Sequence, residues 1–377
     1  MSRVEDSACD ACLRRAFLVG RLAPRIAGLL DRPGRRTSGL LALSESDLLA
    51  AVAGERAEQI ALDLEHFAPD AERERLARAR VLALCRHAAE YPGGLRDLDD
   101  PPAALFAAGR HEALELLCSE PAVAIVGTRD PSPYGTEVAR SLGRGLGAAG
   151  VPVVSGLALG IDATAHRGCL EGGGAAFAVL ACGPDVAYPR RHRRLHEHIR
   201  ENGLVVSELP PGTPPFRWSF PARNRIMAAL SRLTVVVEAA DPSGSLITTD
   251  FARDLGRSVA AVPGRVTSKV ARGTNGLLKD GAVPITSTED VLDELFGVGA
   301  RYPPAAAHSV REPEDPLLRH VLESAERMGS VASIAKAVGL STAETRAALA
   351  RLEGDGYLVR RSLDGWERAL GPILADP

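Results

Sequence analysis

The residues best suited to chemistry in this sequence are arginines beside an aromatic ring. The segment FPARNRIMAALS, at residues 220–231, opens an expected helix and carries Phe220, Arg223, Asn224 and Arg225. An aromatic ring can stack on a nucleic-acid base, and a guanidinium can pair with a phosphate. Phe220 stands directly before a proline and is the better candidate for an exposed ring, whereas Trp218 suits the core equally well. The pattern indicates a surface for bases and phosphates.

Four glycine-bearing turns follow predicted strands, and most of them lead into a helix. They are GTRDPSPYG at 127–135, SGLALGIDATAH at 155–166, CGPDVAYPRRH at 182–192 and DPSGS at 241–245. In an open parallel sheet such loops share one edge, where helix N-termini offer unpaired amides to an anion. The candidate contacts in them are Gly127, Thr128, Arg129, Ser155, Gly156, Arg190, Arg191, His192, Ser243, Gly244 and Ser245. Glycines that merely make tight turns are the alternative.

Catalytic and cofactor motifs are poorly represented. The sequence has neither a G-x-G-x-x-G dinucleotide fingerprint nor a G-x-x-x-x-G-K-[ST] phosphate loop, so no cofactor is expected. Asp162 and His166, four residues apart on one helical face, could form an acid–base pair, but a capping Asp and a structural His are favoured. Glu238 could bind a ribose hydroxyl or a loop arginine. We therefore predict a protein that is not an enzyme.

Composition and cysteine spacing indicate which class of protein this is and in which compartment it works. The net charge is −3, but residues 190–225 carry eight arginines against three acids, so a nucleic-acid site must be local. Six cysteines in 377 residues do not make a disulfide scaffold. Cys9 and Cys12 have half the spacing of a zinc knuckle, with no second CxxC or HxxxH nearby, so no metal is expected. No signal peptide or membrane span is found, which favours a reduced, cytoplasmic protein.

The elements that must position these residues fall into four regions. Residues 1–90 show helical periodicity and predict a small all-α module. Residues 91–297 alternate apolar strands with helices, which predicts a doubly wound, mostly parallel Rossmann-like sheet. Residues 298–316 form a Pro/Ala-rich linker. Residues 317–377 predict three short helices and a hairpin around Asp364, the pattern of a winged helix-turn-helix.

Several motifs in this order resemble the DprA (Smf) family of DNA-processing proteins. They are YPGGL at 91, DPPAALFAAG at 100, VAIVGTR at 123, SGLALGID at 155, FPARNRIMAALS at 220, SGSLITT at 243, VPG at 262 and GTNGLLKDGA at 273. The resemblance implies a SAM-like N-terminal domain and a Rossmann-like domain that binds single-stranded DNA, forms homodimers and loads the RecA recombinase during natural transformation. It places in the DNA pocket Arg129, Ser155, Gly156, Phe220, Arg223, Asn224, Arg225 and the SGS turn of Ser243, Gly244 and Ser245. Where the family usually has an asparagine, four residues after Tyr188, this chain has His192.

Two other functions remain open as alternatives. Similar sheets occur in nucleoside-monophosphate phosphoribohydrolases, whose PGGxGT loop and following glutamate are replaced here by PSGSLITTD. The second alternative function is that of a regulator that binds duplex DNA through the winged helix. Its expected recognition helix at 341–352 offers only Arg346 and Arg351 as arginines, and residues 307–377 carry nine basic against eleven acidic side chains. Duplex binding needs more positive charge than this.

Overall fold

The computed structural model describes residues 8–30, 39–299, 313, 315–328, 330–355, 357–361 and 365–368. The chain divides into two compact units, Met1–Ala306 and Ala307–Pro377. Most of the linker expected at residues 298–316 lies outside the described residues, so that boundary stays a prediction.

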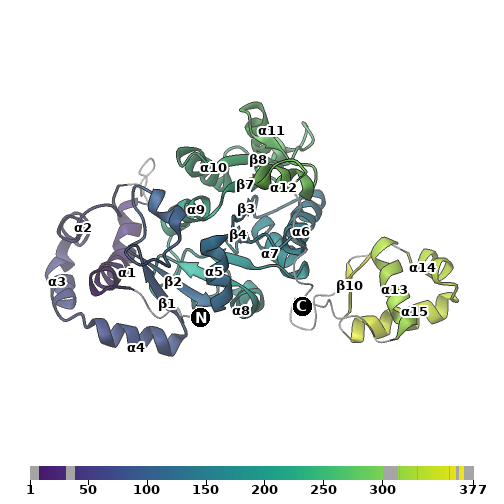
Figure 1. Cartoon of the computed structure of the whole chain (residues 1–377), viewed down its shortest axis with the longest axis horizontal. Coiled ribbons are helices and arrows are strands. Elements are labelled where there is room, and N and C mark those ends of the chain that lie inside the picture. Colours follow the sequence, from purple (N-terminus) through teal and green to yellow (C-terminus); the bar gives the residue numbers. More distant parts are fainter. Residues whose placement is uncertain are drawn as a thin grey trace. The chain divides into compact units, whose positions relative to one another are not determined.

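A nine-stranded sheet forms the centre of the first unit, with helices on both sides (Figure 1). Its strand order is β1-β2-β6-β5-β4-β3-β7-β8-β9. The strands are β1 (Leu82–Cys85), β2 (Ala104–Gly109), β3 (Val123–Val126), β4 (Val153–Ser155), β5 (Ala176–Val179), β6 (Leu204–Ser207), β7 (Leu233–Val236), β8 (Ser258–Ala261) and β9 (Val283–Pro284). From β6 to β9 all neighbours pair in parallel, whereas β2 is antiparallel to both β1 and β6. The predicted mostly parallel α/β sheet is confirmed.

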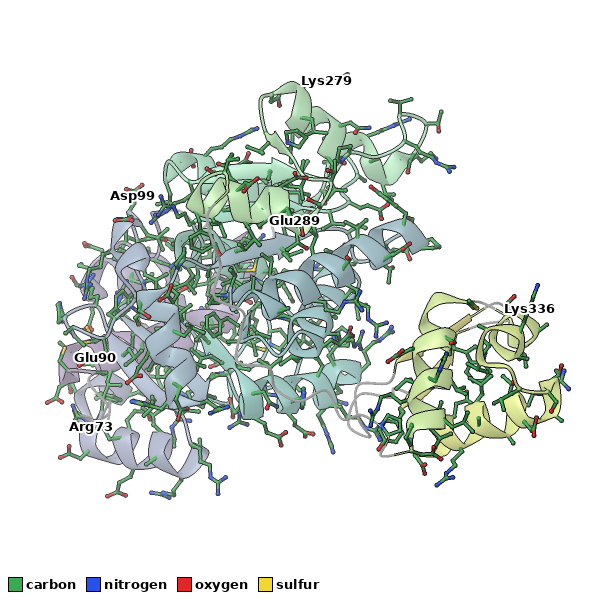
Figure 2. All side chains as sticks on the ribbon, turned by 45° about the vertical axis from the view of Figure 1, so that its right-hand side comes forward. Arg73, Glu90, Asp99, Lys279, Glu289 and Lys336 are labelled. Atoms are coloured by element: carbon green, nitrogen blue, oxygen red, sulfur yellow. The ribbon has the colours of Figure 1, made fainter. Side chains whose placement is uncertain are left out.

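Short apolar runs form this sheet because both of its faces are covered. Strands β3 to β7 are buried along their whole length, as parallel strands under helices on both sides must be. The helices of this unit are α1 (Asp10–Leu30), α2 (Glu45–Val52), α3 (Ala57–Glu65), α4 (Pro69–Ala79), α5 (His111–Ser119), α6 (Pro133–Ala148), α7 (Ile161–Glu171), α8 (Arg193–Asn202), α9 (Ser219–Leu230), α10 (Gly244–Asp254), α11 (Arg272–Lys279) and α12 (Thr288–Phe296). Exposed charged side chains such as Glu90, Lys279 and Glu289 project outward (Figure 2).

Helices α6 and α7 approach each other closely because glycines line their contact. A Cβ added to Gly143 would lie 2.4 Å from the carbonyl oxygen of Ala165, so no larger residue fits there without a shift. On the other side of the central strands, α9 packs against α10 (Figure 1). Helix α9 is the segment that carries the predicted arginines and Phe220.

The N-terminal region differs from the all-helical prediction in one respect. Helix α2 is capped by Ser44, whose hydroxyl accepts a hydrogen bond of 3.1 Å from the amide of Asp47. Residues 82–85, however, form a strand that pairs with β2. Helix α4 ends at Ala79, and Arg80 after it adopts a left-handed conformation. The apolar run that follows is too short for its periodicity to distinguish a helix from a strand. The sheet therefore begins inside the region expected to be purely helical.

The second unit is built from three helices followed by two antiparallel strands. They are α13 (Pro316–Arg327), α14 (Val331–Val338), α15 (Thr342–Gly354), β10 (Leu358–Arg361) and β11 (Gly365–Arg368). Leucines and isoleucines of all three helices form its own core. Ser341 caps α15 by accepting a hydrogen bond of 3.2 Å from the amide of Glu344, and the amide of Ser341 donates in return to the Glu344 carboxylate at 2.9 Å. Asp364, around which the hairpin was predicted, lies outside the described residues, and the winged-helix assignment stays a prediction.

Candidate nucleic-acid interface

The predicted loops converge on one edge of the sheet. Strands β5, β4, β3 and β7 are consecutive and parallel, so the loops that follow them leave at the same edge. The chain moves from β3 to β4 on one side and later returns to place β7 on the other side of β3. Such a change of direction opens a crevice at the carboxyl ends of the strands, which is where open α/β sheets bind ligands.

A pocket of about 70 Å³ lies at this edge. Its walls come from three loops and from helix α9. They are Arg129, Gly156, Ala158, Leu159, Leu180, Ala181, Cys182, Tyr188, Pro189, Phe220 and Arg223. Four of the predicted contact residues, Arg129, Gly156, Phe220 and Arg223, are thus brought together although they come from segments up to about 90 residues apart in the sequence.

Two aromatic rings and a guanidinium form a platform at the mouth of this pocket. The Cζ atom of Arg129 lies 5.4 Å from the ring centroid of Phe220. The ring of Tyr188 is tilted against Phe220 with centroids 5.7 Å apart, and 43% of Tyr188 is exposed. Phe220 is half-buried, whereas Trp218 is buried and donates its Nε1–H to the carbonyl oxygen of Ala23. Tyr188 was not predicted as a site residue, although it adjoins the predicted Arg190 and Arg191 in the sequence.

Exposed positive charge borders the platform. Arg129 is exposed, and so are Arg190 and Arg191 in the single turn of 3₁₀ helix at Arg190–His192. Within the part of the chain that the structure describes, none of these three guanidiniums has an ion-pair partner. Arg193, in contrast, pairs with Glu197 at 3.2 Å. Unpaired guanidiniums beside stacking rings suit a flexible polyanion with exposed bases.

Arg223 does not have the exposed position that its motif suggested. It is buried, and its Nη1 donates hydrogen bonds to the carbonyl oxygens of Gly156, at 2.6 Å, and Val179. Burial lowers the pKa of Arg223, and the carboxylate of Asp162 opposes that shift. Asp162 in turn accepts a hydrogen bond of 3.1 Å from the amide of Gly156. Arg223 therefore braces the loop after β4 and forms the back wall of the pocket.

The position of Arg225 contradicts the prediction that this residue contacts DNA. Its guanidinium is buried and is bound to the carboxylates of Asp100, at 2.9 Å, and Glu208, at 2.7 Å. Burial alone would lower the pKa of Arg225, but Glu208 and Asp100 more than offset that effect and raise it. With its charge compensated inside the protein, Arg225 is not available to a phosphate, and we remove it from the proposed DNA contacts.

Ser155 and His192 are also structural rather than exposed. Ser155 is fully buried and its hydroxyl donates to the carbonyl oxygen of Ile125 at 2.6 Å. The Nδ1–H of His192 donates to the carbonyl oxygen of Leu157 at 3.0 Å, and Leu157 has a positive φ of 53°. These hydrogen bonds fix the shape of the loop after β4. Their side chains do not face the surface as the sequence pattern had suggested.

The SGS turn is held by helix α9. The side chain of Ser243 caps α10 by accepting from the amide of Ser245, at 3.3 Å, and Asn224 donates to the carbonyl oxygen of Gly244 at 3.2 Å. Asn224 and Ser245 are buried, whereas Gly244 is exposed. Only the tip of this turn can therefore meet a ligand directly.

The loop after β3 is fixed by Glu238, which has a third role besides the two considered from the sequence. Its carboxylate accepts hydrogen bonds from the amide and hydroxyl of Ser132, at 2.8 and 2.6 Å. Its carbonyl oxygen accepts from the amide of Thr128 at 2.7 Å. Gly127 and Thr128 are half-buried, so they position Arg129, which is exposed at the loop tip.

Asp162 and His166 have the structural environment favoured from the sequence. Both are buried on α7, and burial raises the pKa of Asp162 while it lowers the pKa of His166 to about 3. A neutral, enclosed imidazole and a capping carboxyl group do not form an accessible acid–base pair.

Among the described residues, no helix is long and apolar enough to cross a membrane.

A family model and the relatives found by comparison with known proteins indicate the same family. The family model described as DNA recombination-mediator protein A matches residues 83–296. Protein Smf of Synechocystis is 42% identical over 209 residues, which cover 55% of this chain and 52% of that protein, so the match spans about half of the relative's length.

Two solved structures of relatives share the fold. DNA processing protein A (DprA) from Streptococcus pneumoniae is 33% identical, covers 76% of this chain and 96% of its own, and superposes with a TM-score of 0.60. The protein of that name from Helicobacter pylori, whose structure was described for its single-stranded DNA binding mode, is 32% identical. It covers 57% of this chain and 95% of its own, with a TM-score of 0.51.

Proposed function

Because this chain belongs to the DNA recombination-mediator protein A family, we propose that it binds single-stranded DNA along the carboxyl edge of its sheet. The Helicobacter pylori relative, with its single-stranded DNA binding mode, supports the choice of ligand. We further propose that the protein is cytoplasmic and acts in natural transformation. In this role it would protect incoming single strands and load the RecA recombinase onto them. Homodimerisation through the Rossmann-like domain is part of the same proposal.

The observation that carries this proposal is the platform of Arg129, Phe220 and Tyr188. A base placed on the ring of Phe220 would lie beside the guanidinium of Arg129, which already sits 5.4 Å from that ring. Stacking is tolerant of sequence because every base has a π-face. Arg190 and Arg191 are exposed and can contact the phosphates on either side. Bases in a duplex are stacked on one another, so this platform favours a single strand.

The proposal also assigns structures to the regions before and after the Rossmann-like domain. The helices α1 to α4 would represent the SAM-like N-terminal region, and α13 to β11 a winged helix. We assign the second an accessory or protein-contact role, since residues 307–377 carry more acidic than basic side chains. Binding of duplex DNA through this unit is the competing hypothesis. Removal of the residues after Ala300 should leave most of the affinity for single strands.

The direct test compares fluorescence anisotropy of single- and double-stranded oligonucleotides of the same sequence across a salt series. The full chain should bind the single strand more tightly, and the logarithm of its affinity should fall linearly with the logarithm of salt concentration. Equal binding of both forms, or an affinity that salt does not change, would contradict the proposal. Incubation with nucleoside monophosphates covers the enzymatic alternative, because release of free base would favour a phosphoribohydrolase-like function.

A further inference from the structure

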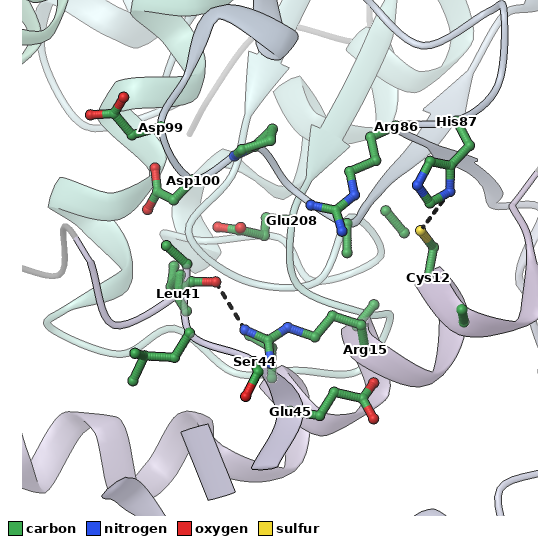
Figure 3. A pocket seen from close by; sticks show the side chains of 18 residues that line it. Cys12, Arg15, Leu41, Ser44, Glu45, Arg86, His87, Asp99, Asp100 and Glu208 are labelled. Carbon is green, nitrogen blue, oxygen red and sulfur yellow. Dashed lines mark hydrogen bonds between the residues drawn. The ribbon is translucent and has the colours of Figure 1, made fainter. Parts of the chain in front are cut away.

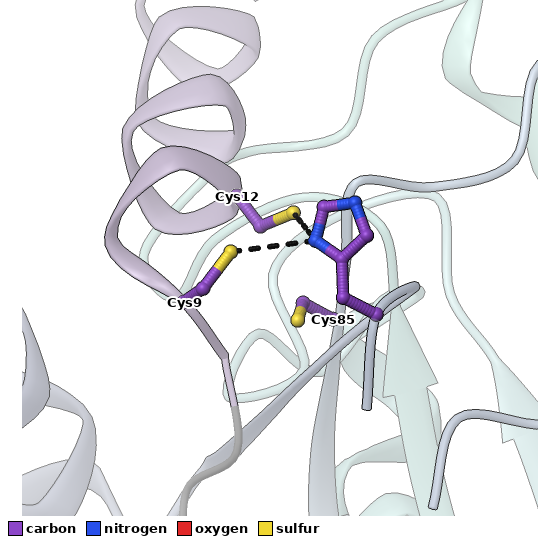
Figure 4. Close-up of side chains that lie close together, drawn as sticks. Cys9, Cys12 and Cys85 are labelled. Atoms are coloured by element: carbon purple, nitrogen blue, oxygen red, sulfur yellow. Dashed lines mark hydrogen bonds between the residues drawn. The ribbon is translucent and has the colours of Figure 1, made fainter. Parts of the chain in front are cut away.

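Three thiols and an imidazole lie close together where helix α1 contacts strand β1. Cys9, Cys12, Cys85 and His87 bring one potential ligand atom each to within 4.8 Å of one another (Figure 4). We call this group the thiol cluster. All six cysteines of the chain lie among the described residues and none forms a disulfide. The sequence showed only the first half of this cluster, because Cys12 and His87 are 75 residues apart.

Two separations within the thiol cluster have the length expected for neighbouring ligands of a tetrahedral metal site. The Sγ atoms of Cys9 and Cys12 each lie 3.5 Å from Nδ1 of His87. With zinc bonds of about 2.3 Å to sulfur and 2.0–2.1 Å to nitrogen, a tetrahedron has sulfur–nitrogen edges of roughly 3.5 Å. Both sulfur–nitrogen contacts have this length, and the four ligand atoms all lie within 4.8 Å of one another, so small side-chain adjustments would close them around one ion.

The four side chains lie in, or directly beside, helix α1 and strand β1. Cys9 directly precedes α1, and Cys12 lies in its first turn, where the amide of Leu13 already bonds the carbonyl oxygen of Cys9 at 3.0 Å. Cys85 is the last residue of β1, and His87 follows two positions later. An apolar cluster of α1, β1 and β2 residues surrounds Cys12 and Cys85. The site therefore depends on packing between the N-terminal helix and the sheet.

We propose that the thiol cluster binds one Zn²⁺ ion as a structural Cys₃His site. Thiolate and imidazole ligands select zinc over calcium or magnesium, which prefer oxygen. Four protein ligands leave no open coordination position, so the ion has a structural rather than catalytic role. It would fasten the start of α1 to the end of β1, and so tie the N-terminal helices to the edge of the sheet.

The surroundings of the thiol cluster supply charge compensation and access. Zn²⁺ with three thiolates carries a net charge of −1, and the exposed Arg86 lies between two of the ligands in the sequence. A cavity of about 330 Å³ is lined by Cys12, His87, Arg15 and Arg86 among others (Figure 3). Because this cavity borders two of the ligands, an ion or a chelator can reach the site from solvent.

Metal analysis of the full chain tests the proposal without reference to DNA. Protein purified under reducing conditions without chelators should contain about one zinc per chain. Cys12→Ser and Cys85→Ser should each lose most of it, while Cys118→Ser, at an exposed cysteine outside the cluster, should keep it. His87→Cys preserves four ligands and should retain zinc. Substitution by Co²⁺ should give the visible bands of a tetrahedral ion in the wild type, with stronger thiolate-to-cobalt absorption in His87→Cys.

A second measurement covers variants that fail to fold. Titration of the wild-type thiols with an organomercurial should release zinc in proportion to the cysteines modified, as detected with a chromogenic chelator. A chain that holds no zinc and takes up none when Zn²⁺ is added would overturn the proposal.

Discussion

The buried guanidinium of Arg223 donates a hydrogen bond of 2.6 Å to the carbonyl oxygen of Gly156. A Cβ on Gly156 would lie 2.0 Å from the same Nη1, so the glycine is required for this approach. The contact joins helix α9 to the loop after β4. Because α9 also carries Phe220, the same helix sets the position of both the stacking ring and the loop that faces it.

Arg223→Ala should therefore lower the stability of the protein rather than remove a direct contact with a DNA phosphate. Removal of the guanidinium leaves the buried Asp162 uncompensated and two carbonyl groups without their donor, which should lower the free energy of unfolding by about 3–5 kcal/mol. Urea denaturation measures this loss. DNA affinity should fall while its salt dependence stays near that of the wild type. A lower salt slope at unchanged stability would instead make Arg223 a direct phosphate ligand.

Arg129→Ala should show the opposite combination. This side chain is exposed and has no ion pair among the described residues, so its loss should leave stability almost unchanged. The slope of log affinity against log salt should fall by about 0.7 for one phosphate contact on a single strand. Arg78→Ala is the matched control, since Arg78 is also exposed but pairs with Glu74 at 3.1 Å on α4. Equal effects of the two substitutions would show that Arg129 has no special role.

Phe220→Ala should weaken binding without a change in salt dependence. Loss of one stacked base costs about 1–3 kcal/mol, or roughly 5- to 150-fold in affinity. Phe220→Tyr keeps the ring and should bind nearly as the wild type does. Equilibrium titration at constant ionic strength distinguishes them. If both variants bind equally well, the ring does not stack on a base, and the platform would have to be abandoned as the base site.

Arg225→Ala tests the correction that the structure makes to the sequence prediction. Asp100 and Glu208 would lose their shared partner inside the protein, so stability should fall by about 3–5 kcal/mol. DNA affinity, measured in conditions where the variant remains folded, should match the wild type. Replacement of Asp100 by Asn in the same chain should restore part of the stability. A variant that folds normally but binds DNA weakly would return Arg225 to the interface.

Local patterns predicted the edge of the sheet but not the direction of every side chain. Apolar runs followed by glycines gave the parallel strands, and parallel strands require their outgoing loops to share an edge. Whether an arginine on α9 faces that edge depends on rotation about the helix and on distant partners. Asp100, which binds Arg225, is 125 residues away, and nothing near the FPARNR motif indicates it.

Long-range pairing also explains the other differences. The short apolar run at 82–85 fits a helix or a strand until β2 pairs with it. Cys9 and Cys12 lacked visible partners because Cys85 and His87 reach them only through the packing of α1 on the sheet. The choice of Phe220 over Trp218 as the more exposed ring agrees with the structure, because the proline after Phe220 is a local signal; its contact with a base stays a prediction.

His166→Gln should change how stability depends on pH. Burial, with smaller contributions from Arg223 and His192, lowers the pKa of His166 from 6.5 to about 3. As the pH falls below 6.5, the unfolded chain gains a proton there while the native imidazole stays neutral. The contribution of this residue to stability is thus present above pH 6.5 and is lost as the pH falls toward 3, by about 1.4 kcal/mol per pH unit.

Urea denaturation of wild type and His166→Gln between pH 7 and 4 measures this effect, since the amide of glutamine does not titrate. The variant should lose stability less steeply with falling pH, whatever its stability at neutral pH. His66→Gln serves as the control, because it makes the same substitution at an exposed histidine. If His166→Gln keeps the wild-type slope, the buried imidazole must take up a proton in the native state, and the enclosed environment described for α7 would be wrong.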